Sequence, residues 1–146
     1  MIGVSEEYDY TTRSVAFHPN GRVLAIGRSD GRIDLLDAPP DGGKLTVIDT
    51  LNHHPSGEGA GGQVYGVDFT TDGALLATAS NGVGVRLWEV ATWAPHGRTI
   101  EAPGGYSDVA LSADGAAVAA QRDDGTVRVW ATDTGLPLLP PIPSVY

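Results

Sequence analysis

The sequence predicts an all-β protein built from three copies of one small, four-stranded antiparallel sheet. The main observation is a segment that occurs three times, at residues 15–21, 67–73 and 109–115. Each copy begins with valine, ends in glycine, and has a bulky apolar residue fifteen positions after that glycine. The twenty glycines and ten prolines, spread between short apolar runs, favour strands and tight turns over long helices. Such fixed spacing indicates repeated copies of one structural unit.

The middle copy shows its strands most clearly. Val67 and Phe69 alternate with Asp68, as expected of a half-buried strand, and Gly73 closes the turn that follows. The next run is apolar over the length of a strand, which is typical of a strand covered on both faces. The four strands predicted in this copy are 64–69, 74–79, 83–89 and a weaker one at 95–101.

The other two copies follow the same pattern. The first is predicted to have strands at 14–18, 22–27, 32–37 and 44–50, and the third at 106–112, 116–121, 126–131 and 136–142. The last of these contains three prolines, which fit only an outermost strand because proline cannot donate a ladder hydrogen bond. Residues 1–146 are therefore expected to form one unit with repeats at 12–51, 63–101 and 105–142 and an inserted loop at 52–62.

These segments resemble the WD-repeat β-propeller family, whose blades carry a Phe-Ser-Pro-Asp-Gly turn and a later Asp-Gly-Thr-Val-Arg-Leu-Trp-Asp run. The matching segments here include Phe17-His-Pro-Asn-Gly21, Val85-Arg-Leu-Trp-Glu89 and Asp124-Gly-Thr-Val-Arg-Val-Trp130. The resemblance covers roughly residues 12–142. It implies that the chain contributes three four-stranded blades to a β-propeller.

The resemblance also implies a hydrogen-bonded network of Asp, His, Ser or Thr, and Trp inside each blade. By position it assigns structural roles to Asp30, Thr78, Trp88, Asp124 and Trp130, with Ser80 as an alternative to Thr78. The histidine position, seven residues before the first valine of each repeat, holds Tyr8, Ala60 and Ala102 instead. No blade is therefore expected to contain the complete network, and apolar packing should dominate.

Three blades are too few for a closed ring, because propellers typically close with about four to eight. The two outermost sheets would each leave an apolar face uncovered, and such faces normally mark an interface. A homo-oligomer is therefore expected. A dimer with six blades is favoured because two-fold symmetry is the commonest, while a trimer and a piece of a longer propeller chain remain as alternatives.

Composition narrows the function classes. The net charge of −9, with a single lysine, argues against nucleic-acid binding, which requires clustered basic residues. No stretch reaches the roughly 18 apolar residues of a membrane span, and the acidic first ten residues do not resemble a secretory signal. A cytoplasmic protein is expected, and the preference for arginine over lysine suggests a bacterial genome rich in GC.

Catalytic and metal-binding chemistry is not expected. His53 and His54 lie in a glycine-rich segment and should be exposed loop residues, since adjacent histidines do not point the same way on an extended chain. His18 and His96 should be structural or exposed. Asp114 and its counterparts Asn20 and Asp72 occupy turn positions, and the resemblance assigns Asp124 to the blade network. Neither a Gly-x-Ser-x-Gly elbow nor a phosphate-binding loop occurs. No enzyme activity, metal or cofactor is predicted.

The resemblance implies that the remaining candidate is the surface such propellers use, near the central opening, at first-strand starts and second-to-third-strand turns. Its candidate partner-binding residues are Arg13, Ser29, Tyr65, Asn81, Ser107 and Asp123. Trp93 stands where similar proteins usually have glycine, and it is either packed on the neighbouring rim strand or an exposed contact. The sequence therefore predicts a non-catalytic scaffold for a protein or peptide. The alternatives are a solvated rim, a sugar-binding (lectin-like) or other small-ligand propeller, and a fragment of a larger bacterial signalling protein.

Overall fold

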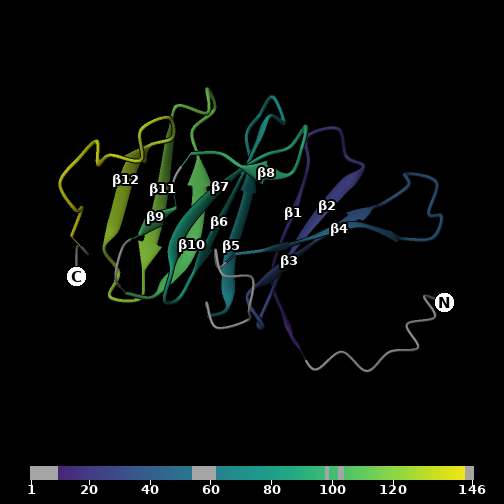
Figure 1. Cartoon of the computed structure of the whole chain (residues 1–146), viewed down its shortest axis with the longest axis horizontal. Coiled ribbons are helices and arrows are strands. Elements are labelled where there is room, and N and C mark those ends of the chain that lie inside the picture. The colour runs from purple at the N-terminus through teal and green to yellow at the C-terminus, as the bar shows by residue number, and fades with distance from the viewer. Residues whose placement is uncertain (1–9, 54–61, 98, 102–103, 144–146) are drawn as a thin grey trace.

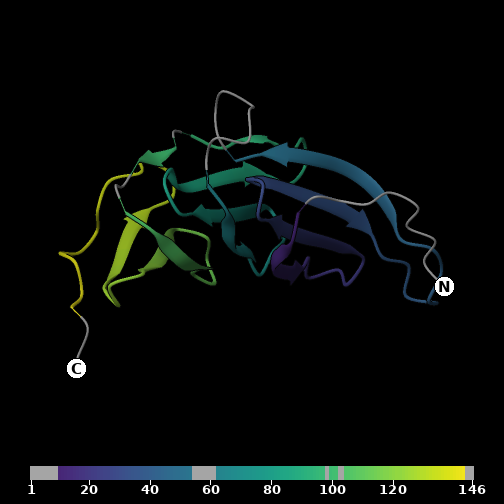
Figure 2. The same cartoon turned by 90° about the horizontal axis from the view of Figure 1, so that it is seen from below.

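The computed structural model of the chain describes residues 10–53, 62–97, 99–101 and 104–143. These residues form three antiparallel sheets and no helix. The sheets follow one another across the molecule in chain order, from the purple first sheet to the yellow-green third (Figure 1). The view from below shows the same succession of sheets side by side (Figure 2). The predicted all-β fold of propeller blades is confirmed.

Each sheet begins with an inner strand and adds the following strands outward. The first sheet has the order β1 (Thr12–Phe17), β2 (Val23–Arg28), β3 (Arg32–Asp37), β4 (Thr46–Asn52). The second contains β5 (Val64–Phe69), β6 (Leu75–Ser80) and β7 (Gly84–Glu89), with β8 (Ala94–Pro95) and β9 (Ile100–Glu101) both paired to β7. The third contains β10 (Tyr106–Leu111), β11 (Ala117–Arg122) and β12 (Val127–Ala131).

The outermost strands of the second and third sheets differ from the prediction. The strand expected at 95–101 is split into β8 and β9, and that expected at 136–142 is reduced to two isolated bridges, Val127–Ile142 and Trp130–Pro137. In the third sheet four residues, 138–141, separate the two bridges, but only Arg128 and Val129 separate their partners on β12, so the outer segment bulges away. The prolines of the third repeat add to this effect because they lack backbone donors.

Two clusters of buried side chains fill the spaces between the described sheets. Between the first and second sheets lie Ala25, Ile33, Leu35, Leu51, Val64, Val67, Phe69, Leu76 and Trp88. Between the second and third lie Ala77, Ala79, Val85, Leu87, Ile100, Tyr106, Val109, Val118, Ala120 and Trp130. The positions that form the first interface recur in the second, offset by 52 residues on one side, as in Ala25 and Ala77, and by 42 on the other, as in Val67 and Val109. The two interfaces are therefore copies of one another.

The turn after the inner strand is held by a hydroxyl and a carboxylate in the second and third sheets. Thr70 donates its hydroxyl hydrogen to Asp72 Oδ1 at 2.7 Å, and the same oxygen accepts from Ala74 N at 2.9 Å. Ser112, Asp114 and Ala116 repeat these bonds at 2.7 and 3.0 Å. Hydrogen bonds from the backbone, and then from the hydroxyl, hold the pKa of both carboxyl groups below its ordinary value.

We expect Asp114 to make the protein sensitive to acid. A carboxyl group whose pKa is lowered in the folded state stabilises the fold fully above the unfolded pKa, near 4, and loses this effect as the pH falls through the lowered native pKa. The urea midpoint should therefore fall below about pH 4, and Asp114→Asn should make that fall shallower because the amide keeps an acceptor but does not titrate.

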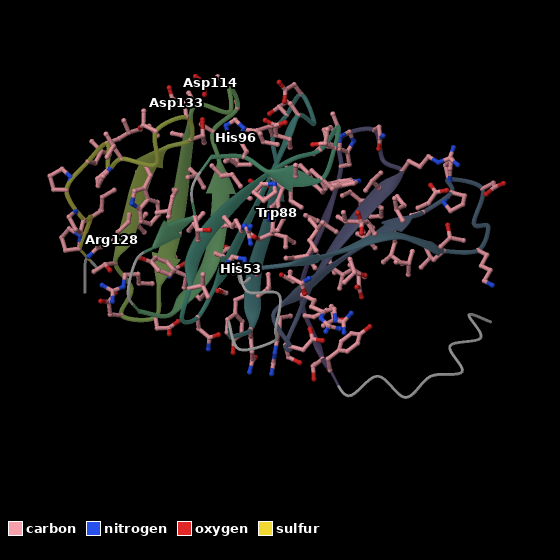
Figure 3. The ribbon with its side chains drawn as sticks, in the orientation of Figure 1. His53, Trp88, His96, Asp114, Arg128 and Asp133 are labelled. Carbon is pink, nitrogen blue, oxygen red and sulfur yellow. The ribbon has the colours of Figure 1, made fainter. Side chains whose placement is uncertain are left out.

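Asp133→Asn provides the matched control for this acid titration. Asp133 is exposed on the neighbouring turn of the same sheet, and both aspartates lie along one edge of the molecule (Figure 3). If the two variants show the same dependence of the urea midpoint on pH, the turn carboxylate does not contribute to acid sensitivity.

Candidate functional site

The inner strand of each sheet starts with a β-bulge. The pairing register shifts between Thr12 and Ser14 in the first sheet, and the same shift recurs in β5 and β10. The extra residues are Arg13, Tyr65 and Ser107, three of the predicted partner-binding residues. A bulge leaves its extra residue outside the ladder and redirects its side chain. The fold thus places these three residues at equivalent positions on successive sheets.

Arg13 and Tyr65 also meet across the boundary between the first and second sheets. The Arg13 guanidinium carbon lies 5.8 Å from the centroid of the Tyr65 ring, within the range of a cation–π contact. Arg13 and Ser107 are exposed, whereas Tyr65 is half-buried. The surface thus has a cation and an aromatic ring on one side and a small hydroxyl on the other.

The other three predicted residues support these bulges from the turns. Ser29 Oγ accepts a hydrogen bond from Thr11 N at 2.8 Å, and Asn81 Oδ1 accepts from Gln63 N at 2.6 Å. Asp123 donates from its backbone N to the Gly105 carbonyl at 3.1 Å. Each bond fixes the chain just before an inner strand. Ser29 and Asn81 therefore use their side-chain oxygens within the fold.

His53 follows β4 of the first sheet and is buried against Thr78 of the second, so the prediction that it is an exposed loop residue is wrong. Its Nδ1 lies 2.8 Å from Thr78 Oγ1, and the same hydroxyl accepts a hydrogen bond from Trp88 Nε1 at 3.1 Å. Figure 3 shows His53 and Trp88 in the middle of the molecule. His53, Thr78 and Trp88 thus supply the His, Thr and Trp of the family network, and Gly82 stands at the Asp position.

The expectation that no repeat has the network histidine is corrected for the same reason. His53 directly follows β4, so the inserted residues lie after it and not before it. The residue seven positions before Val67 is therefore Ala60, which lies inside the insertion and does not correspond to the network histidine. Tyr8, Ala60 and Ala102, the positions found at this spacing, lie outside the described residues.

Comparisons with known proteins agree with this geometry. A model of the family described as "WD domain, G-beta repeat" matches residues 45–89 and 89–131, which together exceed half of the chain. A second model, "Anaphase-promoting complex subunit 4 WD40 domain", matches residues 3–46. The chain belongs to the WD-repeat β-propeller family.

Several curated WD-repeat relatives are similar to the chain. It is 30% identical to guanine nucleotide-binding protein subunit beta-2 of Caenorhabditis elegans over 81% of this chain and 30% of that protein. It is 30% identical to periodic tryptophan protein 2 of Saccharomyces cerevisiae over 84% of this chain and 12% of that protein. Mouse protein Atg16l2 is 36% identical over 53% of this chain and 11% of its own length. The chain thus spans less than a third of each of these relatives.

The other residues assigned to the WD-repeat network have different partners. Asp30 pairs with Arg28 at 2.5 Å, and Asp124 Oδ1 accepts from Thr126 N at 2.9 Å and from its hydroxyl at 2.6 Å. These bonds from the Thr126 hydroxyl and backbone lower the pKa of Asp124. Both aspartates therefore close turns.

Trp130 is buried without the hydroxyl that serves Trp88. Ala120 occupies the position equivalent to Thr78 in the third sheet, and the Trp130 ring instead meets the edge of Tyr106 with centroids 6.1 Å apart. Ser80, the alternative to Thr78, is buried, but the hydroxyl that contacts His53 Nδ1 and Trp88 Nε1 belongs to Thr78. Thr78 is thus the residue that joins the network.

A polar cluster in the first WD-repeat blade escaped sequence reasoning. The Arg28 guanidinium contacts Asp34 at 3.0 Å, and its carbon lies 3.3 Å from the centroid of the Tyr10 ring. Tyr10 precedes Val15 by five residues. His53 precedes Val67, the equivalent valine of the second repeat, by fourteen residues, and nine of these positions are the inserted segment 54–62. Removing that insertion aligns Tyr10 with His53, and this alignment is the signal that could have identified the cluster.

Trp93 packs against the core of the protein. It is half-buried and contacts the cluster between the first and second sheets. Its φ of 56° is positive, and its counterpart in the third repeat is Gly135 with φ 70°. A non-glycine residue in this region carries strain of about 1 kcal/mol or more. Packing of the indole offsets this cost.

His18 and His96 both have protein partners. His18 Nε2 lies 3.0 Å from the Gly73 carbonyl of the second sheet, while His96 Nδ1 lies 3.1 Å from Glu89 Oε1. No group of three or more His, Asp or Glu residues suited to a metal occurs among the described residues. The described chain also has no helix long and apolar enough to cross a membrane.

Proposed function

We propose that this WD-repeat protein is a non-catalytic scaffold that binds a protein or peptide and completes its propeller ring with a second copy of itself. Arg13, Tyr65 and Ser107 would contact the partner, because tyrosine and arginine are the residue types that most often anchor interfaces. The WD-repeat family membership supports a role in protein interaction. The repeated pockets of a sugar-binding propeller receive less support, because these three residues differ in kind.

Self-assembly is supported first by the uncovered face of the first sheet. Val15 and Phe17 are 61% and 60% exposed, whereas their counterparts Val67 and Phe69 are each 8% exposed because the first sheet covers them. The first sheet thus presents the same apolar face, without a described neighbour to cover it.

The third sheet presents the opposite face. Val127 and Val129 are half-buried, while their counterparts Val85 and Leu87 are buried against the third sheet. Ile142, the counterpart of buried Ile100, is exposed. The two open faces are therefore the two halves of the interface that already occurs twice within the chain. Two copies joined at both pairs of faces would form a closed six-bladed ring with two-fold symmetry.

We expect the chain to behave as a dimer of twice 15.1 kDa in light scattering coupled to size exclusion. Phe17→Asp should shift it to the monomer mass, because a charge placed at the centre of an apolar interface is desolvated without a partner. Leu136→Asp is the matched control, since Leu136 is 64% exposed but lies on the outer edge. A wild-type chain that stays monomeric at high concentration would contradict self-assembly.

A further inference from the structure

The internal interfaces of this protein require small residues where the inner strands approach the next sheet. A Cβ added to Gly66 would lie 2.8 Å from Val109 N, and one added to Gly27 would lie 2.7 Å from the Val64 carbonyl oxygen. Ser14, opposite Gly27, donates its hydroxyl hydrogen to the same carbonyl at 3.3 Å. The first and second sheets thus each carry a glycine at this point of close approach.

The third sheet differs at the same two positions. Asp108 is the counterpart of Ser14 and Gly66, and Gln121 is the counterpart of Gly27 and Ala79. Both side chains are exposed, they stand opposite each other on β10 and β11, and they border a shallow hollow of about 180 Å³. The face of the third sheet that points away from the second is therefore polar at Asp108 and Gln121. Farther out on the same face it is apolar, at Ala119 and Val127.

Asp108 is available to a cation outside the described chain. Its Oδ1 accepts a hydrogen bond from Val109 N at 2.8 Å, and no basic side chain among the described residues lies within ion-pair distance of it. An exposed carboxylate beside an apolar face is a feature that a positively charged partner group complements.

The opposite end of the molecule carries a suitable cation. Arg13 is exposed, and among the described residues it forms no ion pair. Across the first boundary the two bulge residues, Arg13 and Tyr65, lie side by side. By the same relation, Arg13 of a second copy would come beside Ser107, the residue that precedes Asp108.

We propose that Arg13 of one copy pairs with Asp108 of the other at each seam of the ring, with Gln121 beside them. This inference rests on the self-assembly proposed above. Because Asp108 and Gln121 replace counterparts that are serine or alanine with one glycine in each internal interface, the seam closes less tightly than those interfaces. The ion pair then directs the face of the third sheet to the first sheet of another copy.

The test is a charge exchange in the full 146-residue chain, with the dimer dissociation constant measured by sedimentation at low salt. Arg13→Glu and Asp108→Arg should each raise that constant about tenfold or more, because like charges then meet at both seams. The double variant should return to within about threefold of the wild type. Lys44→Glu and Asp133→Arg make the same charge changes at exposed sites away from the seam and should leave the constant nearly unchanged.

The outcomes separate this inference from the proposed function. A wild-type chain that dimerises, with single variants that behave like Lys44→Glu and Asp133→Arg, would overturn the ion pair and leave self-assembly intact. A wild-type chain that remains monomeric would overturn both. Unchanged circular dichroism spectra of the exposed Arg13 and Asp108 variants will show that any loss of dimer is not a loss of fold.

Discussion

Replacing Trp88 by alanine is expected to lower the free energy of unfolding by about 3–5 kcal/mol. Trp88 is 4% exposed and belongs to the cluster that joins the first and second sheets. The substitution removes the ring from this core together with its hydrogen bond to Thr78 and the stacking of Arg86, whose guanidinium carbon lies 4.5 Å from the ring centroid. Since domains of this size are stable by about 5–15 kcal/mol, much of the total would be lost.

The effect on stability can be measured by urea denaturation followed by circular dichroism, which does not depend on the tryptophan that is removed. Trp93→Gly is the matched control, because it deletes the same side chain from the margin of the same cluster and relieves a positive φ. Its loss should be clearly smaller. If Trp88→Ala shifts the urea midpoint no further than Trp93→Gly does, Trp88 does not anchor the core.

The stacked sheets could be predicted because their signals are local and repeated. Val67 and Phe69 alternate with Asp68, and the spacing from Gly73 to Trp88 recurs from Gly115 to Trp130. These patterns fix which residues face the neighbouring sheet. The outer strands were predicted less well, because their pairing depends on where extra residues bulge out, which the apolar pattern does not record.

His53 shows where counting along the chain fails. The position of a residue relative to the next strand is informative only while no insertion intervenes, and here the insertion lies between His53 and β5. The end of β4 in fact positions the histidine, since Arg86 Nη1 donates to the carbonyls of Asn52 and His53 at 3.1 and 3.0 Å. Contacts of this kind form only after the strands have paired, so the sequence carries no short-range signal for them.

Ser29 and Asn81 illustrate the same limit within the candidate site. Each bonds to a backbone N–H eighteen residues earlier in the chain, across the start of an inner strand. Their turn positions were predictable from the repeat, but their partners were not. The bulges that expose Arg13, Tyr65 and Ser107 likewise arise from pairing register and have no signature in the residues themselves.

Thr78→Val is expected to lower the free energy of unfolding by about 1–3 kcal/mol, although valine has nearly the shape of threonine. The change removes the hydroxyl shared by His53 Nδ1 and Trp88 Nε1 and leaves both buried nitrogens without this partner. Thr78→Ser retains the hydroxyl and loses only a methyl group. If the two hydrogen bonds contribute more to stability than packing of the methyl group, Thr78→Val should have a lower urea midpoint than Thr78→Ser.

A double-mutant cycle with Trp88→Phe isolates the bond between Thr78 and the indole. Trp88→Phe removes the donor, so Thr78→Val should cost less in that background, by about 0.5–3 kcal/mol of coupling. Thr78 Oγ1 accepts the indole hydrogen bond, so its own hydroxyl hydrogen remains available to another acceptor. The nearer acceptor is His53 Nδ1 at 2.8 Å, since the Arg86 carbonyl lies at 3.5 Å. Part of the Thr78→Val loss should therefore persist in the double variant. Strict additivity of the two substitutions would show that the bond between Thr78 and the indole adds nothing to stability.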